Sequence, residues 1–151
     1  MLQGGDAHAT FEDVIASVPK PLRGVVPPGA SHSAWQLLEH LRICQWDILE
    51  FSRDPGHVSP EFPDGLWPRD PEPPDERAWD RSVDAFRSDA RAMQRLVADA
   101  KRDLLARVAH PDAKAKHTLL REALVLAAHN SYHLGQLVLL RRLLGDWREG
   151  R

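Results

Sequence analysis

The chain has 151 residues, of which 42% are hydrophobic and 28% are charged, and its formal net charge at pH 7 is -2. This length is enough for a hydrophobic core, and we expect residues 1–151 to form a single domain. The small net charge argues against nucleic acid as a partner, because no basic stripe is present to bind phosphates. No apolar run approaches the roughly 18 residues that a membrane-spanning helix needs.

The cysteine content and the first residues of the chain bear on its cellular compartment. Cys44 is the one cysteine, so no internal disulfide can form. This suits a reducing compartment. The first twenty residues lack the basic start and apolar core of a signal peptide. We therefore expect a cytoplasmic protein.

The N-terminal third predicts two helices joined by a proline-rich connection. Over residues 6–18, apolar residues recur at helical spacing until Pro19 ends the pattern. Ser31 or Ser33 can cap a second helix that ends near Arg53. The apolar residues of this second helix form a continuous seam with alternating spacings of four and three: Leu37, Leu41, Cys44, Ile48 and Phe51.

Residues 54–74 are rich in proline and carboxylates, which excludes a helix or a central strand. Fully extended, this segment reaches about 70 Å. The second helix is only about 33 Å long. The segment can therefore return along the whole second helix, so that the second and third helices run parallel. Trp67 is expected to anchor it.

The C-terminal half predicts two longer helices. The third begins at Asp75 and continues to about Val108, because apolar residues alternate at spacings of four and three: Trp79, Val83, Phe86, Ala90, Met93, Val97, Ala100 and Leu104. Thr118 caps the fourth, which runs to Leu144 and is closed by Gly145. Since no strand pattern is visible, we predict an all-α fold: a four-helix bundle with a long crossover loop between the second and third helices.

Two histidines stand out in the predicted fourth helix. His129 and His133 are four residues apart, which places both imidazoles on one helix face, where they can bind one metal ion. Their apolar neighbours indicate an interior position, where an unpaired imidazole is costly. Gly135, in mid-helix, indicates either close approach of another helix or room for a ligand. The alternative is a histidine pair that is simply hydrogen-bonded in the core or on the surface.

The second helix supplies a third imidazole, His40, since facing helices of a bundle lie about 8–10 Å apart. Three histidines with an open fourth position are typical of a catalytic metal site. Cys44, one turn from His40, is interpreted as a small buried residue of the seam; as a fourth ligand it would instead close the site and indicate a structural metal. Asp47 is a candidate to support the ligands from outside, and Gln136 and Tyr132 are candidates to orient a substrate.

The pair does not follow the metalloprotease pattern. That pattern needs a glutamate directly after the first histidine as general base. Here the position holds Asn130. Peptide hydrolysis by that mechanism is therefore disfavoured.

Three segments together resemble the DinB-like (damage-inducible DinB/YfiT-type) superfamily: Trp35–Arg42, Gln45–Leu49 and His129–Gln136. The resemblance extends from about residue 10 to Trp147. It implies a four-helix bundle with a long crossover, and frequent homodimers. It also implies a divalent metal, with zinc or nickel the leading candidates, held by the residues that match the motif, His40, His129 and His133, with water completing the shell.

The activities that the resemblance implies involve small thiols. Members of known activity include thiol transferases that use bacillithiol or glutathione and a mycothiol-dependent isomerase. We therefore expect a metal-dependent enzyme that transfers a low-molecular-weight thiol to an electrophile. The alternative is a non-catalytic metal-binding protein of the stress response. A third possibility is a bundle without metal, in which the histidines are hydrogen-bonded to side chains.

Overall fold

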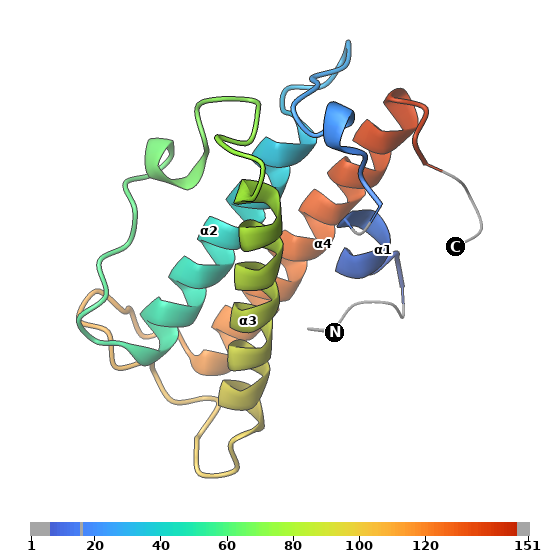
Figure 1. The fold of residues 1–151 in the computed structure, drawn as a ribbon. Helices are drawn as coiled ribbons and strands as arrows, with labels where there is room; N and C mark the ends of the chain where they lie inside the picture. The colour runs from blue at the N-terminus through green and yellow to red at the C-terminus, as the bar shows by residue number, and fades with distance from the viewer. Residues whose placement is uncertain (1–6, 16, 148–151) are drawn as a thin grey trace.

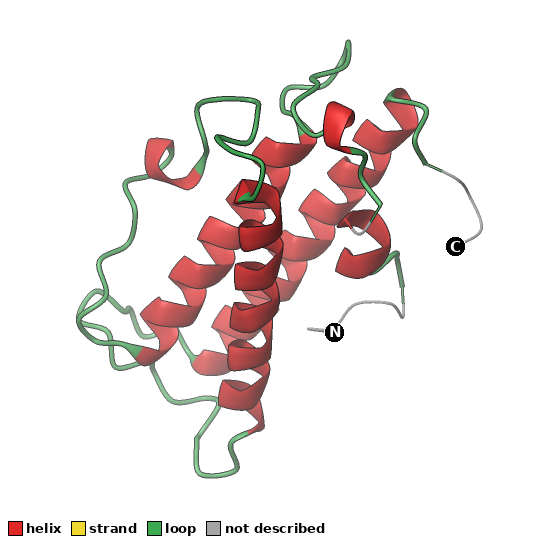
Figure 2. Cartoon of the chain, viewed as in Figure 1, coloured by secondary structure: helices red, strands yellow, loops and turns green. Residues whose placement is uncertain are grey.

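The computed structural model describes residues 7–15 and 17–147, and these residues form helices and loops without any strand (Figures 1 and 2). The four α-helices are α1 (Phe11–Ile15), α2 (Ala34–Arg53), α3 (Ala78–Ala98) and α4 (Leu119–Leu143). Two short 3-10 turns, η1 (Lys20–Leu22) and η2 (Asp64–Leu66), lie in the connections. The predicted all-α class is confirmed. Among the described residues, no helix is both long and apolar enough to cross a bilayer.

The first helix is much shorter than predicted. Its pattern covered residues 6–18, whereas α1 spans Phe11–Ile15, and residues 6 and 16 lie outside the described part. Thr10 and Asp13 exchange hydrogen bonds between their side chains and backbone N–H groups, which fixes the start of the helix. The apolar residues that defined the pattern are all buried: Phe11, Val14, Ile15 and Val18.

α2 begins where one of the two predicted caps places it. The side chain of Ser33 accepts a hydrogen bond from the Gln36 N–H, and the Gln36 side chain accepts one from the Ser33 N–H. This reciprocal capping box selects Ser33 over Ser31 as the cap. In the second half of the helix, Leu49 is fully buried, and the predicted seam residue Ile48 packs only partly against the core.

α3 ends ten residues before the predicted boundary near Val108. The Asp99 carboxylate accepts a hydrogen bond from the Lys101 N–H (3.0 Å), and the Asp103 carboxylate accepts one from the Leu105 N–H (2.9 Å). These local bonds satisfy the backbone in turns and so compete with the helix. Apolar residues therefore keep their helical spacing beyond Ala98, although the helix has already ended there.

α4 has the two predicted ends. The Thr118 hydroxyl accepts a hydrogen bond from the Arg121 N–H at the first turn. At the other end Gly145 has φ +70°, the left-handed conformation that glycine adopts most readily. The helix therefore starts and stops through local signals in the sequence.

Two apolar clusters fill the bundle, and a polar layer lies between them. The upper cluster joins α1 to the first halves of α2 and α3 and to the last turns of α4, from Leu134 onward. The lower cluster joins Leu49, the end of α3 and the first turns of α4, up to Leu126. Between Leu126 and Leu134, α4 presents its two histidines to α2.

Residues 54–77 connect the lower end of α2 to the upper end of α3, so that both helices run in the same direction (Figure 1). The upper part of this crossover segment is bound to α2. The Ser33 hydroxyl donates to the Pro71 carbonyl (2.5 Å), and the Gln36 amide donates to the Pro68 carbonyl (3.2 Å). The residues just before Pro68, including Trp67, are thereby held beside His40.

Candidate metal centre

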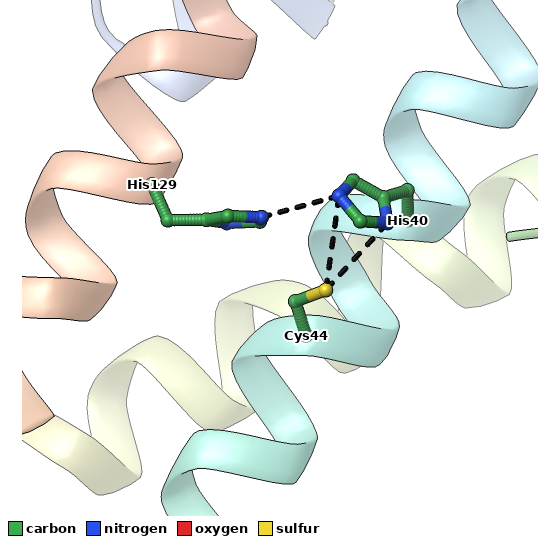
Figure 3. A group of neighbouring side chains, drawn as sticks. All are labelled: His40, Cys44 and His129. Atoms are coloured by element: carbon green, nitrogen blue, oxygen red, sulfur yellow. Dashed lines mark hydrogen bonds between the residues drawn. The ribbon is translucent and has the colours of Figure 1, made fainter. Parts of the chain in front are cut away.

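The imidazoles of the three predicted histidines meet between α2 and α4. His40 Nε2 lies 3.1 Å from His129 Nε2 and 3.2 Å from His133 Nε2. Figure 3 shows His129 of α4 pointing across to His40 of α2, with Cys44 one turn further along α2. His40 and His133 are 6% and 7% exposed, and His129 is half-buried.

The crossover segment fixes the orientation of His40. The Nδ1 atom of His40 lies 2.8 Å from the Leu66 carbonyl oxygen. A carbonyl only accepts, so Nδ1 carries the proton and Nε2 of the neutral ring presents a lone pair. The indole of Trp67 covers one face of the ring, with the two ring centroids 3.7 Å apart and nearly parallel, and His32 stacks with Trp67 at 4.1 Å.

Gln136 fixes the orientation of His133 in the same way. Its amide nitrogen donates to the Tyr132 hydroxyl (3.3 Å), and its carbonyl oxygen lies 2.6 Å from His133 Nδ1. Nδ1 of His133 is therefore the protonated nitrogen, and Nε2 presents a lone pair. Gln136 thus supports a histidine, and Tyr132, which is 64% exposed, borders the site toward solvent.

Two distances within the donor set fit a divalent cation. Without a positive charge between them, two nitrogen lone pairs that face each other at 3.2 Å repel. Two histidine nitrogens bound to one tetrahedral zinc ion lie about 3.3 Å apart. The distances from His40 Nε2 to the other two rings are close to this value.

Burial keeps the three rings in the form that binds metal. It lowers the pKa of His40 to about 4 and that of His129 to about 4, and it also lowers the pKa of His133. Neighbouring imidazoles depress the pKa of His40 and His129 further. The rings are consequently neutral at pH 7, and neutral imidazole is the ligand form.

Cys44 belongs with His40 and His129, but not His133, to a group of mutually close donor atoms. The Cys44 sulfur and one ring nitrogen each of His40 and His129 all lie within 4.8 Å of one another, so these three residues could hold a metal. The sulfur is nearer to His40 Nδ1 (3.5 Å) than to Nε2 (3.8 Å). It therefore lies beside the ring, whereas a cation bound by Nε2 lies beyond that nitrogen. Burial raises the pKa of Cys44 to about 12, which keeps it as a thiol.

Asp47 and Gly135 lie in surroundings that differ from those that the sequence predicted. Asp47 pairs with His57 of the crossover segment, its carboxylate 2.7 Å from His57 Nε2, rather than with an imidazole of the metal centre. Gly135 is exposed, and a side chain there would meet no atom within 4 Å. Close approach of another helix of the same chain is therefore not the reason for this glycine.

The sequence alone did not point to several supports of the site. Leu66 acts through its backbone, which leaves no signal in side-chain type. The sequence predicts Trp67 as the anchor of its segment, but nothing in the local sequence links Trp67 to His40. Gln45 and Asn130 form a hydrogen bond between α2 and α4 (3.0 Å) and could have been found only by pairing the two helices in the correct register.

Comparison with known proteins identifies one family. The family model described as the DinB superfamily matches residues 5–137, which is most of the chain. Neither the search of curated proteins nor the search of solved structures found a match.

Proposed function

Because the chain belongs to the DinB superfamily, and because three of its imidazoles converge between α2 and α4, we propose that His40, His129 and His133 bind a divalent metal ion through Nε2. The observation that carries this proposal is that hydrogen bonds fix the ring orientations of His40 and His133. Leu66 and Gln136 hold the protons of His40 and His133 on Nδ1, so that two lone pairs face each other at 3.2 Å. Zinc and nickel are the leading candidates, since both accept imidazole ligands.

We further propose that the protein is an enzyme that joins a low-molecular-weight thiol to an electrophile. Three nitrogen ligands leave a coordination position for an exchangeable molecule, as in catalytic metal sites. A bound divalent cation lowers the pKa of a thiol or water molecule that reaches this position. In such a transfer the thiolate sulfur forms a bond to the electrophilic carbon, the leaving group departs with its electron pair, and the thiol proton passes to the leaving group or to solvent.

The surroundings of the histidines suit a small substrate. Tyr132 and half-buried His129 lie on the solvent side, and the Tyr132 hydroxyl accepts a hydrogen bond from Gln136. A substrate that contacts Tyr132 would thus be linked through Gln136 to His133. Trp67 closes one face of His40, which limits the directions from which a molecule can approach.

The second candidate function is non-catalytic metal binding in a stress response. The observation that favours it is the proximity of Cys44, whose sulfur lies within 4.8 Å of donor atoms of His40 and His129. Movement of the Cys44 side chain toward His40 Nε2 would give a fourth protein ligand. A closed shell of four protein ligands is typical of structural zinc.

Metal analysis and thiol conjugation test these proposals. The purified protein should contain about one equivalent of a divalent metal, and His129→Ala should lose it while retaining its helical circular dichroism. With zinc or nickel bound, the protein should accelerate conjugation of bacillithiol, mycothiol or glutathione to a chromogenic aryl halide. Wild-type protein that binds metal without accelerating conjugation of any of these thiols would refute the transferase and leave the non-catalytic function. Failure to bind either metal would refute both.

A further inference from the structure

We infer that Asn130, held in place by Gln45, positions His129 so that its Nε2 lone pair faces the other two imidazoles. This inference rests on the proposed metal site and extends it to residues outside the ligand set. Asn130 follows His129 on α4, and Gln45 follows Cys44 on α2. Both lie in the polar layer between the two apolar clusters.

A series of hydrogen bonds starting in the core fixes the Asn130 side chain. Gln45 is 1% exposed, and its amide nitrogen donates to the backbone carbonyl of Phe86 on α3 (2.6 Å). Because a carbonyl only accepts, this bond determines which end of the Gln45 amide is the oxygen. That oxygen accepts a hydrogen bond from the Asn130 amide nitrogen (3.0 Å). The Asn130 oxygen is therefore left free as an acceptor.

The atom that needs this acceptor lies on the neighbouring residue. His129 Nδ1 and the Asn130 side-chain oxygen are both buried, and neither forms a hydrogen bond within normal limits. Burial is the main influence on the pKa of His129 and lowers it, whereas the Asn130 side chain acts in the opposite direction. That opposite effect is expected of an acceptor close to the ring. One hydrogen bond between them would satisfy both buried atoms.

The consequence is a common arrangement for all three histidines. His40 has the Leu66 carbonyl at Nδ1 and His133 has the Gln136 amide oxygen, and in the inferred arrangement the Asn130 amide oxygen takes the same place at His129. Each acceptor is uncharged and holds the proton on Nδ1. In this arrangement all three histidines keep the Nε2 lone pair available for a metal, as second partners of metal-binding histidines usually arrange.

Two substitutions of Asn130 separate positioning from packing. Asn130→Leu removes both the acceptor for His129 and the donor to Gln45, whereas Asn130→Asp loses the donor to Gln45 but keeps an oxygen for His129. Zinc affinity, measured by competition with a chromogenic chelator, should fall about 10–100-fold in Asn130→Leu, as for other outer-shell partners of metal ligands. It should stay within a few-fold of wild type in Asn130→Asp. Ser52→Ala on α2 is the control, because Ser52 is a buried polar residue whose side chain bonds to the Ile48 carbonyl of its own helix; its zinc affinity should be unchanged.

The ring nitrogens of His129 give a second readout that packing alone would not change. In protein with 15N-labelled histidine, the His129 signals are assigned by their loss in His129→Gln. They should indicate a proton on Nδ1 in wild type and in Asn130→Asp, and a mixture of tautomers in metal-free Asn130→Leu. Equal zinc affinity and equal tautomers in wild type and Asn130→Leu would overturn the inference.

The two proposals can fail separately. If wild-type protein does not bind zinc, the proposed metal site is wrong, and the tautomers of the metal-free proteins still decide the role of Asn130. If Asn130→Leu does not fold, Asn130→Asp decides: a proton on Nδ1 of its His129 supports the role of the acceptor, and a mixture of tautomers contradicts it.

Discussion

At the residue scale, the histidines differ in the group that lies at Nδ1, the ring nitrogen that points away from the other imidazoles. The partner of His133 is Gln136, three residues later on the same helix. The partner of His40 is a backbone carbonyl of the crossover segment. Such partners determine which ring nitrogen has the lone pair, so they decide whether a histidine can bind metal at a given point.

Cys44 distinguishes an open site from a closed one. Since its sulfur lies beside the His40 ring, we expect Cys44→Ala to bind zinc within about twofold of wild type, with a stability loss of about 1 kcal/mol from the small cavity. The cobalt-substituted wild-type protein should lack the intense near-ultraviolet absorption of a cobalt–thiolate bond.

The opposite result would also be clear. A near-ultraviolet band that is present in the wild-type cobalt protein and absent in Cys44→Ala would show a fourth protein ligand. The non-catalytic function would then be favoured over the transferase.

At the element scale, the crossover segment is part of the site as well as a connection. It contributes the Leu66 carbonyl and the Trp67 indole to His40, and its upper part is held to α2 by the hydrogen bonds of Ser33 and Gln36. The lower part is held by the pair of His57 with Asp47. A loop bound at both ends can therefore keep an aromatic ring on a buried histidine.

The contact between Trp67 and His40 predicts a fluorescence signal. Of the five tryptophans, Trp67 has its ring 3.7 Å from the ring of a proposed ligand, so nickel or cobalt bound there should quench its emission strongly. Trp67→Phe should remove most of the metal-dependent quenching while metal still binds, because phenylalanine can also stack on the imidazole.

Trp46→Phe is the matched control, because Trp46 lies on α2, the helix of His40, but contacts His57 instead. It should retain the quenching of wild type. Equal loss of quenching in the two variants would contradict the position of Trp67 on the metal centre.

At the scale of the whole molecule, one side of α4 is left largely uncovered by the described residues, where Ser131 forms a side-chain hydrogen bond with His8 (2.9 Å). From Leu124 to Leu139, the exposed residues of α4 are all uncharged: Leu124, Val125, Ala128, Ser131, Tyr132, Gly135 and Leu139. Most exposed helix faces in soluble proteins carry charges. A second copy of the chain would present the same uncharged face, and the small residues in its middle would permit close contact, so we propose a homodimer through α4.

Leu139→Glu tests this dimer. Leu139 is 57% exposed, and a carboxylate there would be desolvated in a dimer but not in a monomer. Sedimentation should show a dimer for wild type and a concentration-dependent shift to monomer for Leu139→Glu. Val58→Glu makes the same chemical change at a residue that is 84% exposed in the crossover segment, and it should remain dimeric. A wild-type protein that sediments as a monomer at all concentrations would refute the proposal.

Local signals in the sequence determined much of this protein. Apolar spacing and the caps Ser33, Thr118 and Gly145 predicted α2 and the ends of α4, because helix formation and termination depend on residues within one or two turns. The spacing of His129 and His133 was sufficient to place them on one face. The spacing of apolar residues predicted an α3 that is too long, because short-range hydrogen bonds of Asp99 and Asp103 favour turns after Ala98.

The tertiary structure decided how these elements form a site. Only the packing of α2 on α4 brings His40 Nε2 to the histidine pair, and only the return of the crossover segment brings Leu66 and Trp67 to His40. The same packing joins Gln45 to Asn130 and places the Cys44 sulfur beside the ring. These contacts connect residues far apart in the chain, and they depend on helix register and rotation, which local spacing does not specify.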